Sequence, residues 1–292
     1  MSKTANVILC VCIAIGTFSS RAFCAVSAEF KQKVDTLTWV AYAPTNMDPD
    51  QGEFPTQDSI REDLATLYQY GFRGIVTYGA NSSLAEIPRI ASETGFTGII
   101  MGIWDLNSQE ELMNATLAMR YVDGYCVGNE GLNVRYSLET LNQVMQGLRN
   151  STSKPVTTTE EINDYYNNYT NLTSVGDWIF PNIHPFLYQV KDPKKAAIWL
   201  SKHYKLLMKR ASPDTIVLVK EAGFPTSGAP RASETNQKEF FLALKETGVR
   251  FVYFEAFDQP WKTTLSVEPH WGLFNRHRKP KRFIATLSCS KD

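Results

Sequence analysis

The chain has 292 residues, of which 43% are hydrophobic and 21% are charged, and its 30 basic and 30 acidic residues cancel. This length suits one large α/β barrel, which typically takes about 250 residues, so a single catalytic domain is expected. The zero net charge argues against a long-range field that would draw the protein onto nucleic acid or an anionic membrane. A neutral substrate fits this balance better than a polyanion.

The first residues have the plan of a secretory leader. Lys3 supplies a positive start, the stretch Val7–Phe18 is mostly apolar, and Val26-Ser27-Ala28 offers small residues at a cleavage point. We therefore expect a signal peptide over residues 1–28 and a mature barrel domain over 29–292. The expected location is secreted or periplasmic, without stable membrane association after leader cleavage. An uncleaved anchor is the alternative, although the apolar stretch is short for a bilayer.

Cysteine usage gives no sign of a disulfide framework. Cys10, Cys12 and Cys24 lie in the leader, which leaves Cys126 and Cys289 for the mature chain. Stability is therefore expected to come from core packing. No Cys/His spacing is typical of a zinc site and no glycine loop is typical of phosphate binding, so neither a metal nor a cofactor is expected. We expect a monomer.

Eight apolar stretches recur along the chain, each followed by a polar segment, and this alternation is typical of a parallel sheet with crossover helices. Eight strands in one domain of this size favour an α/β fold of the (β/α)8 TIM-barrel type over an open doubly wound sheet. The predicted strands are Trp39–Pro44, Gly74–Gly79, Thr97–Trp104, Val122–Glu130, Pro155–Glu160, Trp178–Phe186, Thr215–Glu221 and Arg250–Phe257.

Helix starts and ends are also marked in the sequence. The patterns Ser59-x-x-Glu62, Ser83-x-x-Glu86 and Ser108-x-x-Glu111 predict capping boxes, in which a serine and a glutamate satisfy free amides at a helix start. Gly71 is predicted to end the first of these helices in a left-handed conformation. Residues 161–176, after the fifth predicted strand, show no clear helical period.

Two glutamates lie beside glycines at the ends of predicted strands, Glu130 in Val127-Gly128-Asn129-Glu130 and Glu221 in Glu221-Ala222-Gly223-Phe224-Pro225. A carboxylate at the end of a buried strand is costly unless it is hydrogen-bonded or used in chemistry. Barrel enzymes carry their chemistry at the carboxyl ends of the strands, so both side chains are expected to face one cleft. Two facing carboxylates are the equipment of a glycosidase. The alternative is a structural role for each, paired with a nearby Lys or Arg.

Six motifs occur in an order that is typical of one enzyme family. Together they resemble glycoside hydrolase family 17 from about Trp39 to Lys281, and fungal and bacterial members more than plant ones. The motifs are Gly102-Ile103-Trp104-Asp105, Val127-Gly128-Asn129-Glu130-Gly131, Asn182-Ile183-His184-Pro185-Phe186, Glu221-Ala222-Gly223-Phe224-Pro225, Tyr253-Phe254-Glu255-Ala256-Phe257-Asp258 with Trp261-Lys262, and Trp271-Gly272-Leu273-Phe274.

The resemblance implies a clan A barrel that acts on β-1,3-glucan with retention. It implies that Glu130 is the general acid/base and Glu221 the nucleophile. It also implies that Asn129 hydrogen-bonds the sugar 2-hydroxyl, a contact that should strengthen in the transition state. Further substrate-binding positions implied along the cleft are Tyr78, Glu255 and Lys262.

Three more residues are candidates for substrate contacts. Trp104 and Trp261 lie near strand ends, where they could stack on sugar faces, and packing beneath loops is the alternative role for both. His184, before a proline on the sixth predicted strand, could hydrogen-bond a sugar hydroxyl or orient a catalytic carboxylate. A purely structural histidine is the alternative there.

Two positions depart from the family pattern. Phe224 stands where the family usually has tryptophan, which keeps an apolar platform for substrate but loses the indole donor. Val76 stands where many members carry an arginine near the nucleophile. Lys220 is not expected to replace that charge, because its side chain should point away from that of its strand neighbour Glu221.

The leading hypothesis is an exported, metal-independent hydrolase or glucanosyltransferase whose partner is a neutral β-glucan or oligosaccharide. A catalytically silent glucan-binding barrel is one alternative, and a hydrolase of another neutral β-glycoside is a second. The basic run 276–282 is interpreted as a solvated connection near the C-terminus rather than as a nucleic-acid site.

Overall fold

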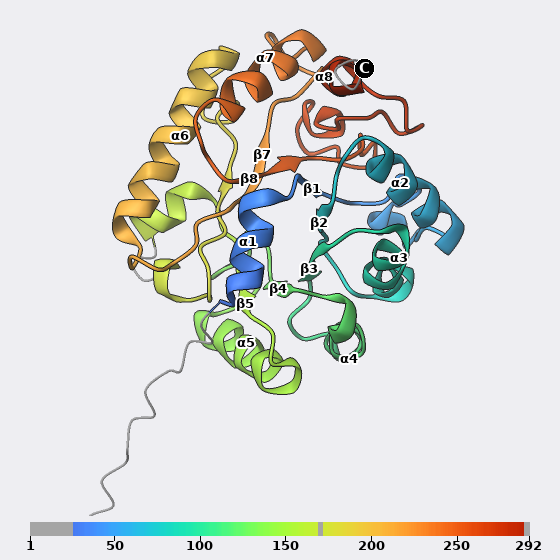
Figure 1. Ribbon diagram of the computed structural model, residues 1–292, viewed down its shortest axis with the longest axis vertical. Coiled ribbons are helices and arrows are strands. Elements are labelled where there is room, and N and C mark those ends of the chain that lie inside the picture. The colour runs from blue at the N-terminus through green and yellow to red at the C-terminus, as the bar shows by residue number, and fades with distance from the viewer. Residues whose placement is uncertain (1–25, 169–171, 289–292) are drawn as a thin grey trace, which may run out of the picture.

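The apolar stretches form eight short parallel strands in a computed structural model that describes residues 26–168 and 172–288 (Figure 1). Each strand lies within or overlaps its predicted segment, and the predicted (β/α)8 barrel is confirmed. The strands are β1 (Trp39–Ala41), β2 (Gly74–Val76), β3 (Gly98–Ile103), β4 (Gly124–Val127), β5 (Val156–Thr157), β6 (Asn182–Ile183), β7 (Val219–Gly223) and β8 (Phe251–Phe254).

The strand order is β5-β4-β3-β2-β1-β8-β7-β6, and all pairings between neighbours are parallel. The two outer strands of this order are joined by a parallel bridge between Glu161 and Asn182. The backbone amide of Asn182 also donates to the backbone carbonyl of Glu160 at 3.0 Å. The carboxyl ends of all eight strands therefore meet at one rim, where a site in this fold is expected.

Helices surround the strands in the order that the sequence predicts (Figure 1). The connection from β5 to β6 differs, because its described part contains a π-helix over Asp164–Asn168 and a 3-10 turn over Leu172–Ser174. This is the segment without a helical period. The α-helices are α1 (Ala28–Thr36), α2 (Gln57–Gln69), α3 (Ile87–Thr94), α4 (Gln109–Leu117), α5 (Leu138–Thr152), α6 (Pro193–Arg210), α7 (Glu234–Lys245) and α8 (Arg282–Ser288).

Two of the three predicted capping boxes are wrong. Helix α2 begins earlier than predicted, because the hydroxyl of Thr56 accepts the amide of Ser59 at 3.2 Å and makes Thr56 the N-cap. Ser83 lies inside the 3-10 turn Ser82–Glu86. The predicted end of α2 is confirmed, since Gly71 follows its C-cap with φ of +93°, a conformation that glycine adopts readily.

The third pattern caps a helix but uses its glutamate differently. Ser108 is the N-cap of α4, and its hydroxyl accepts the amide of Glu111 at 3.2 Å. The Glu111 carboxylate, however, accepts backbone amides of Ala80 at 2.9 Å, Trp104 at 2.8 Å and Asp105 at 3.1 Å. This buried glutamate therefore joins the chain after β2 to the chain after β3 at the rim.

The amino-terminal end of the barrel is closed by aromatic side chains. Trp39 lies against Gly74 and Gly98, where an added Cβ atom would come within 2.3 and 2.6 Å of the indole. Glycine at the start of β2 and β3 therefore makes room for this side chain. Helix α1 covers the same end, and its Phe30 packs on Trp178 with ring centroids 5.1 Å apart.

Most residues of the basic run near the C-terminus are exposed, as expected of a solvated connection, but two of them are anchored. The Arg278 guanidinium donates to the fully buried carboxylate of Asp63 at 2.7 Å. The Lys281 ammonium, itself 7% exposed, donates to Asp258 at 2.6 Å. Both contacts hold the C-terminal segment against the rim of the barrel.

The predicted leader lies almost entirely outside the described residues. Of residues 1–28, the structure describes only the last three, and α1 already begins at Ala28 with Ser27 as its N-cap. None of the helices in the described part of the chain has the length and apolar content that crossing a bilayer requires. The signal peptide and the cleavage point stay predictions.

Candidate active site

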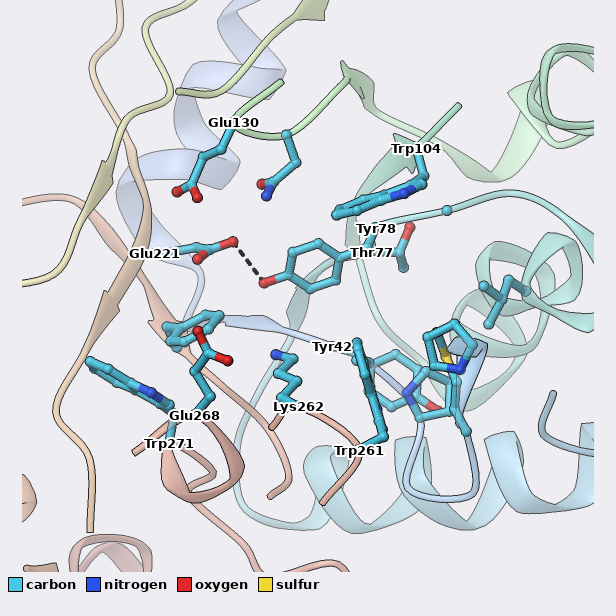
Figure 2. A pocket seen from close by; sticks show the side chains of 18 of the residues that line it. Tyr42, Thr77, Tyr78, Trp104, Glu130, Glu221, Trp261, Lys262, Glu268 and Trp271 are labelled. Carbon is cyan, nitrogen blue, oxygen red and sulfur yellow. Dashed lines mark hydrogen bonds between the residues drawn. The ribbon is translucent and has the colours of Figure 1, made fainter. Parts of the chain in front are cut away.

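The two predicted glutamates meet at the carboxyl rim of the barrel. Glu221 lies within β7, and Glu130 lies three residues after the end of β4. One oxygen of each carboxylate and one ring nitrogen of His184 all lie within 4.8 Å of one another. Figure 2 shows the carboxylates of Glu130 and Glu221 directed into the same space. Two acidic groups from distant parts of the sequence thus share one cleft.

Glu221 is nearly buried and is held by three donors. The Tyr78 hydroxyl donates to its Oε1 at 2.9 Å, and the Lys220 ammonium donates to the same oxygen at 3.0 Å. Nε2 of His184 lies 3.0 Å from Oε2. Burial by itself raises the pKa of Glu221, but the charge of Lys220 and the hydrogen bond to His184 outweigh it and hold the pKa well below its usual range. This carboxylate is ionised near neutral pH.

Glu130 has the opposite environment. Its backbone is left-handed, with φ of +50°, and its side chain is exposed to the cleft. The Asn182 amide donates to its Oε1 at 2.6 Å. Desolvation in the cleft and the negative charge of Glu221 raise the pKa of Glu130. The geometry therefore pairs an ionised carboxylate with one that retains its proton to higher pH.

The prediction that Lys220 points away from Glu221 is wrong. Pairing of β7 with β8 shifts between Val219, opposite Phe251, and Ala222, opposite Tyr253. Two residues of β7 therefore face one residue of β8, which is a β-bulge. The bulge breaks strict alternation, and the Lys220 and Glu221 side chains meet.

Asn129 also faces the cleft, through a turn rather than a strand. β4 ends at Val127, and Gly128 follows with φ of +75°. Oδ1 of Asn129 accepts from the Lys220 ammonium and, at 3.4 Å, from the Asn182 amide. Sequence reasoning did not single out Lys220 or Asn182 as site residues. A lysine in the apolar stretch of β7 beside a glutamate is the signal that could have identified the first.

At the end of β8 the structure separates two predicted substrate contacts. Lys262 lines the cleft, and its ammonium donates to Glu255 at 2.7 Å. Glu255 itself is fully buried, so its prediction as a direct substrate contact is wrong. Burial raises the pKa of Glu255 to about 7, against the opposing charge of Lys262. Glu255 is therefore connected to the cleft through its ion pair with Lys262.

The cleft has a volume of about 730 Å³. Aromatic side chains stand around it (Figure 2). Trp104 and Trp261 both line it, and Trp104 is 44% exposed. Arg135 lies 4.3 Å from the centroid of the Trp104 ring, so it supports one side of the indole. Trp271 lines the cleft as well, although sequence reasoning placed it only in a family motif.

Phe224 does not line the cleft. It is fully buried and packs against Phe186 and Phe240, with centroids 5.1 and 5.6 Å away. Its prediction as a substrate-binding residue is therefore wrong. Phe224 comes one residue after the end of β7, and its ring turns into the layer between the strands and the helices. Burial away from water stabilises an apolar ring there.

The carboxylates and His184 are close enough to be tested as a metal site. Within residues 26–168 and 172–288, the spacing of acidic, histidine and cysteine side chains gives this one candidate group. Nε2 of His184 already contacts Oε2 of Glu221, and the other oxygen of Glu221 accepts from the Lys220 ammonium. A fixed positive charge beside the ligands disfavours a cation, so these residues fit acid/base chemistry better.

Comparison with known proteins assigns the chain to a family. Residues 40–272 match the family described as "BtgE/BtgC glycoside hydrolase domain". The chain belongs to this family. The matched segment extends from β1 to the chain after β8 and contains both glutamates of the cleft.

Fungal relatives are similar over most of this chain. "Probable beta-glucosidase btgE" of Aspergillus fumigatus is 28% identical over 245 residues, covering 77% of this chain and 43% of the relative. "Probable glucan endo-1,3-beta-glucosidase btgC" of Aspergillus clavatus is 24% identical over 285 residues, covering 80% of this chain and 40% of the relative. The chain thus spans less than half the length of these BtgE and BtgC proteins.

Solved structures share the fold of this BtgE/BtgC domain. A beta-1,3-glucanase and allergen of Cryptomeria japonica pollen has a TM-score of 0.63 at 14% identity, over 84% of this chain and 97% of that one. The GH5_18 protein of Streptomyces cattleya in complex with GlcNAc has a TM-score of 0.64 at 16% identity, over 88% and 81%. At such identities the likeness concerns the fold alone.

Proposed function

We propose that this BtgE/BtgC domain is a retaining glycosidase that cleaves β-1,3-glucosidic bonds in β-glucan through a covalent glycosyl-enzyme. The observation that carries the proposal is the pair of carboxylates in one cleft, with an oxygen of Glu130 within 4.8 Å of one of Glu221. Retaining enzymes place their carboxyl groups roughly 5–5.5 Å apart, and inverting enzymes roughly 6.5–9.5 Å apart. This spacing is closer to that of retaining enzymes than to that of inverting ones, which supports retention.

The two environments favour different roles. Glu221 is ionised, and its three donors hold it in a fixed position, so it is the proposed nucleophile. Glu130 has a raised pKa and is open to the cleft, so it is the proposed acid/base. This division follows the rule that paired carboxylates with pKa values pushed apart take the acid and the ionised role respectively.

The proposed reaction has two displacements. In the first, an oxygen of Glu221 forms a bond to the anomeric carbon while the glycosidic C–O bond breaks and Glu130 gives its proton to the departing oxygen. In the second, Glu130 takes a proton from water, the water oxygen bonds to the anomeric carbon, and Glu221 leaves as a carboxylate. A sugar hydroxyl in place of water gives glucanosyl transfer instead.

The remaining cleft residues have proposed binding roles. Asn129 donates to the sugar 2-hydroxyl, and Lys262 donates to a sugar hydroxyl from the connection that follows β8. Trp104 and Trp261 offer faces on which sugar rings stack. These groups are polar or aromatic and suit a neutral glucan.

The choice of β-1,3-glucan is supported by two kinds of comparison. The btgC relative is named a glucan endo-1,3-beta-glucosidase, and a plant beta-1,3-glucanase shares the fold. The six sequence motifs support the narrower placement in glycoside hydrolase family 17. Export and a monomeric state remain part of the proposal, since they rest on the sequence.

The test is incubation of residues 29–292 with laminarin oligosaccharides, with products separated by size. We expect shorter products, an anomeric configuration that is retained, and no activity in Glu221→Gln. Products longer than the substrate would identify transfer as the main outcome. Binding without release of reducing sugar at any pH from 4 to 8 would refute catalysis and favour a glucan-binding barrel. Turnover only of another β-linkage would refute the proposed substrate.

A further inference from the structure

Lys220 is a charged side chain with almost no access to water. Its residue is 1% exposed, and it belongs to the bulge of β7. Burying an ammonium group is costly unless partners surround it, so such a lysine is rare without a purpose. Its partners all belong to the proposed active site.

The Lys220 ammonium contacts three side chains from three parts of the rim. It donates to Oε1 of Glu221 at 3.0 Å and to Oδ1 of Asn129. It also lies 4.4 Å from the centroid of the Tyr78 ring, whose hydroxyl reaches the same oxygen of Glu221. An ammonium group has three hydrogens and no lone pair, so every contact it makes is with an electron-rich partner.

This property fixes the amide of Asn129. Because Lys220 can only donate, the Asn129 side chain must present its oxygen to it, and the Asn182 amide donates to that oxygen as well. The NH2 group of Asn129 is then left for the cleft, which Asn129 lines. If the Asn129 amide were flipped, its NH2 group would face two other donors, the Lys220 ammonium and the Asn182 side-chain amide. The cleft therefore receives a hydrogen-bond donor at this position.

We propose that Lys220 is a positioning residue that joins the two catalytic motifs, holding the Asn129 amide toward the sugar 2-hydroxyl and holding the Glu221 carboxylate toward the anomeric carbon. This inference deepens the proposed function and rests on it. Lys220 touches no substrate, so it acts through these two neighbours. One ammonium thereby aligns both groups that should act on the same sugar ring in the transition state.

The pH dependence of Glu221 involves every strand end that faces it. The titratable and charged groups around it are Lys220 on β7, Tyr78 after β2, Cys126 on β4, Glu130 after β4, His184 after β6 and Glu255 after β8. Among them, Lys220 forms an ion pair with Glu221, with its Nζ 3.0 Å from Oε1. Its removal should raise the pH at which Glu221 becomes protonated.

The first measurement is the pH profile of kcat/KM for an aryl β-glucoside. In Lys220→Met the acid limb should move upward by about one pH unit or more, because an opposite charge in contact is lost. Lys220→Arg should restore it in part. Lys281→Met is the matched control: it removes another buried ammonium paired with a carboxylate, at 2.6 Å, away from the cleft. It should lower thermal stability without moving the acid limb.

The second measurement tests the amide. Wild-type kcat/KM for the aryl β-glucoside is compared with that for its 2-deoxy analogue, after subtraction of the uncatalysed rates. In Lys220→Met the preference for the 2-hydroxyl should shrink by about threefold to tenfold, the range of one lost hydrogen bond. Lys220→Leu, which likewise has no charge and no donor, provides a second variant if Lys220→Met does not fold.

The outcomes separate the two proposals. If the wild type turns over glucosides while the neutral variants keep both its acid limb and its 2-hydroxyl preference, the positioning role is refuted and the glycosidase is not. If both features change in Lys281→Met as well, a general effect of stability explains them and the role is also refuted. A wild type without turnover on any glucoside refutes the proposed function, and this inference with it.

Discussion

Replacing Glu221 by glutamine should lower the pKa of Glu130. In the wild type, desolvation in the cleft and the negative charge of Glu221 raise that pKa. Glutamine keeps the shape of the side chain and removes its charge. Lys220 then has no carboxylate partner at this position, so its positive charge also favours the ionised form of Glu130.

The size of the effect follows from the separation of the carboxylates. One oxygen of each lies within 4.8 Å of the other, and at that distance two unit charges interact with about 3.5 kcal/mol at an effective dielectric constant of about 20, and with about 0.9 kcal/mol in bulk water. Glu130 is open to the cleft, so solvent screening moves the coupling toward the lower figure. The loss of charge on Glu221 also affects His184, which lowers the pKa of Glu130, and this offsets part of the expected fall in the pKa of Glu130. Burial lowers the pKa of His184, but Glu221 outweighs this effect, so the variant also weakens a positive charge near Glu130.

Carbon-13 NMR titration of protein with labelled glutamate carboxyl groups measures this directly, without reference to turnover. Glu130→Gln assigns the resonance by its disappearance. Glu161→Gln is the matched control, because Glu161 also lines the cleft and raises the pKa of Glu130 less than Glu221 does. An unchanged or higher midpoint for Glu130 in Glu221→Gln would refute the coupling on which the division of roles depends.

Three further predictions concern rate and stability. Glu130→Gln should slow glucosides with poor leaving groups far more than activated aryl glucosides, because only the former need a proton. Burial raises the pKa of Glu160 to about 7 from an ordinary value of 4.5. The protonated Glu160 therefore stabilises the fold fully below about pH 4.5, and this contribution of about 3 kcal/mol is lost as the pH rises through 7. Glu160→Gln should remove that part of the slope. Asp63→Asn should cost about 3–5 kcal/mol by leaving Arg278 without its buried partner.

Each of these has its own check. Equal losses of Glu130→Gln activity on both classes of glucoside would contradict its role as acid. Urea unfolding at several pH values measures the Glu160 slope, and an identical slope in the variant would contradict the assignment. For Asp63 the matched control is Asp58→Asn in the same helix, whose partner Arg61 lies 3.0 Å away but whose side chain is 90% exposed. Equal effects of the two substitutions would show that burial is not the cause.

The barrel could be predicted because its signals are local. Each strand is an apolar stretch that needs no distant information, and the chain order then leaves few topologies for eight parallel strands. Helix starts were less predictable. Thr56 caps α2 in place of Ser59, since a pattern of two residue types cannot show which of two nearby hydroxyls reaches the first free amide. Glu111 was assigned to its own helix but binds amides beyond it.

The site was predictable where it depends on strand ends and not where it depends on side-chain direction. Glu130 and Glu221 could be placed together because both come at the end of an apolar stretch of the sequence. Phe224 and Glu255 were placed in the cleft although both are fully buried, because position along the chain does not show which side of the sheet a residue faces beyond a strand end. Lys220 was placed outside it by a rule of alternation that the bulge suspends.

The departures from strict alternation fall at the two motifs that are proposed to be catalytic, and this coincidence has a mechanical reason. A regular strand can direct only one of two consecutive side chains into the cleft. The turn at Gly128 and Glu130, both with positive φ, lets Asn129 and Glu130 face it together. The bulge does the same for Lys220 and Glu221. Four side chains of the proposed site then come from two short segments, and the hydrogen bond from Lys220 to Asn129 joins these segments. A substitution that restored regular pairing across the bulge should therefore reduce activity even with both glutamates intact.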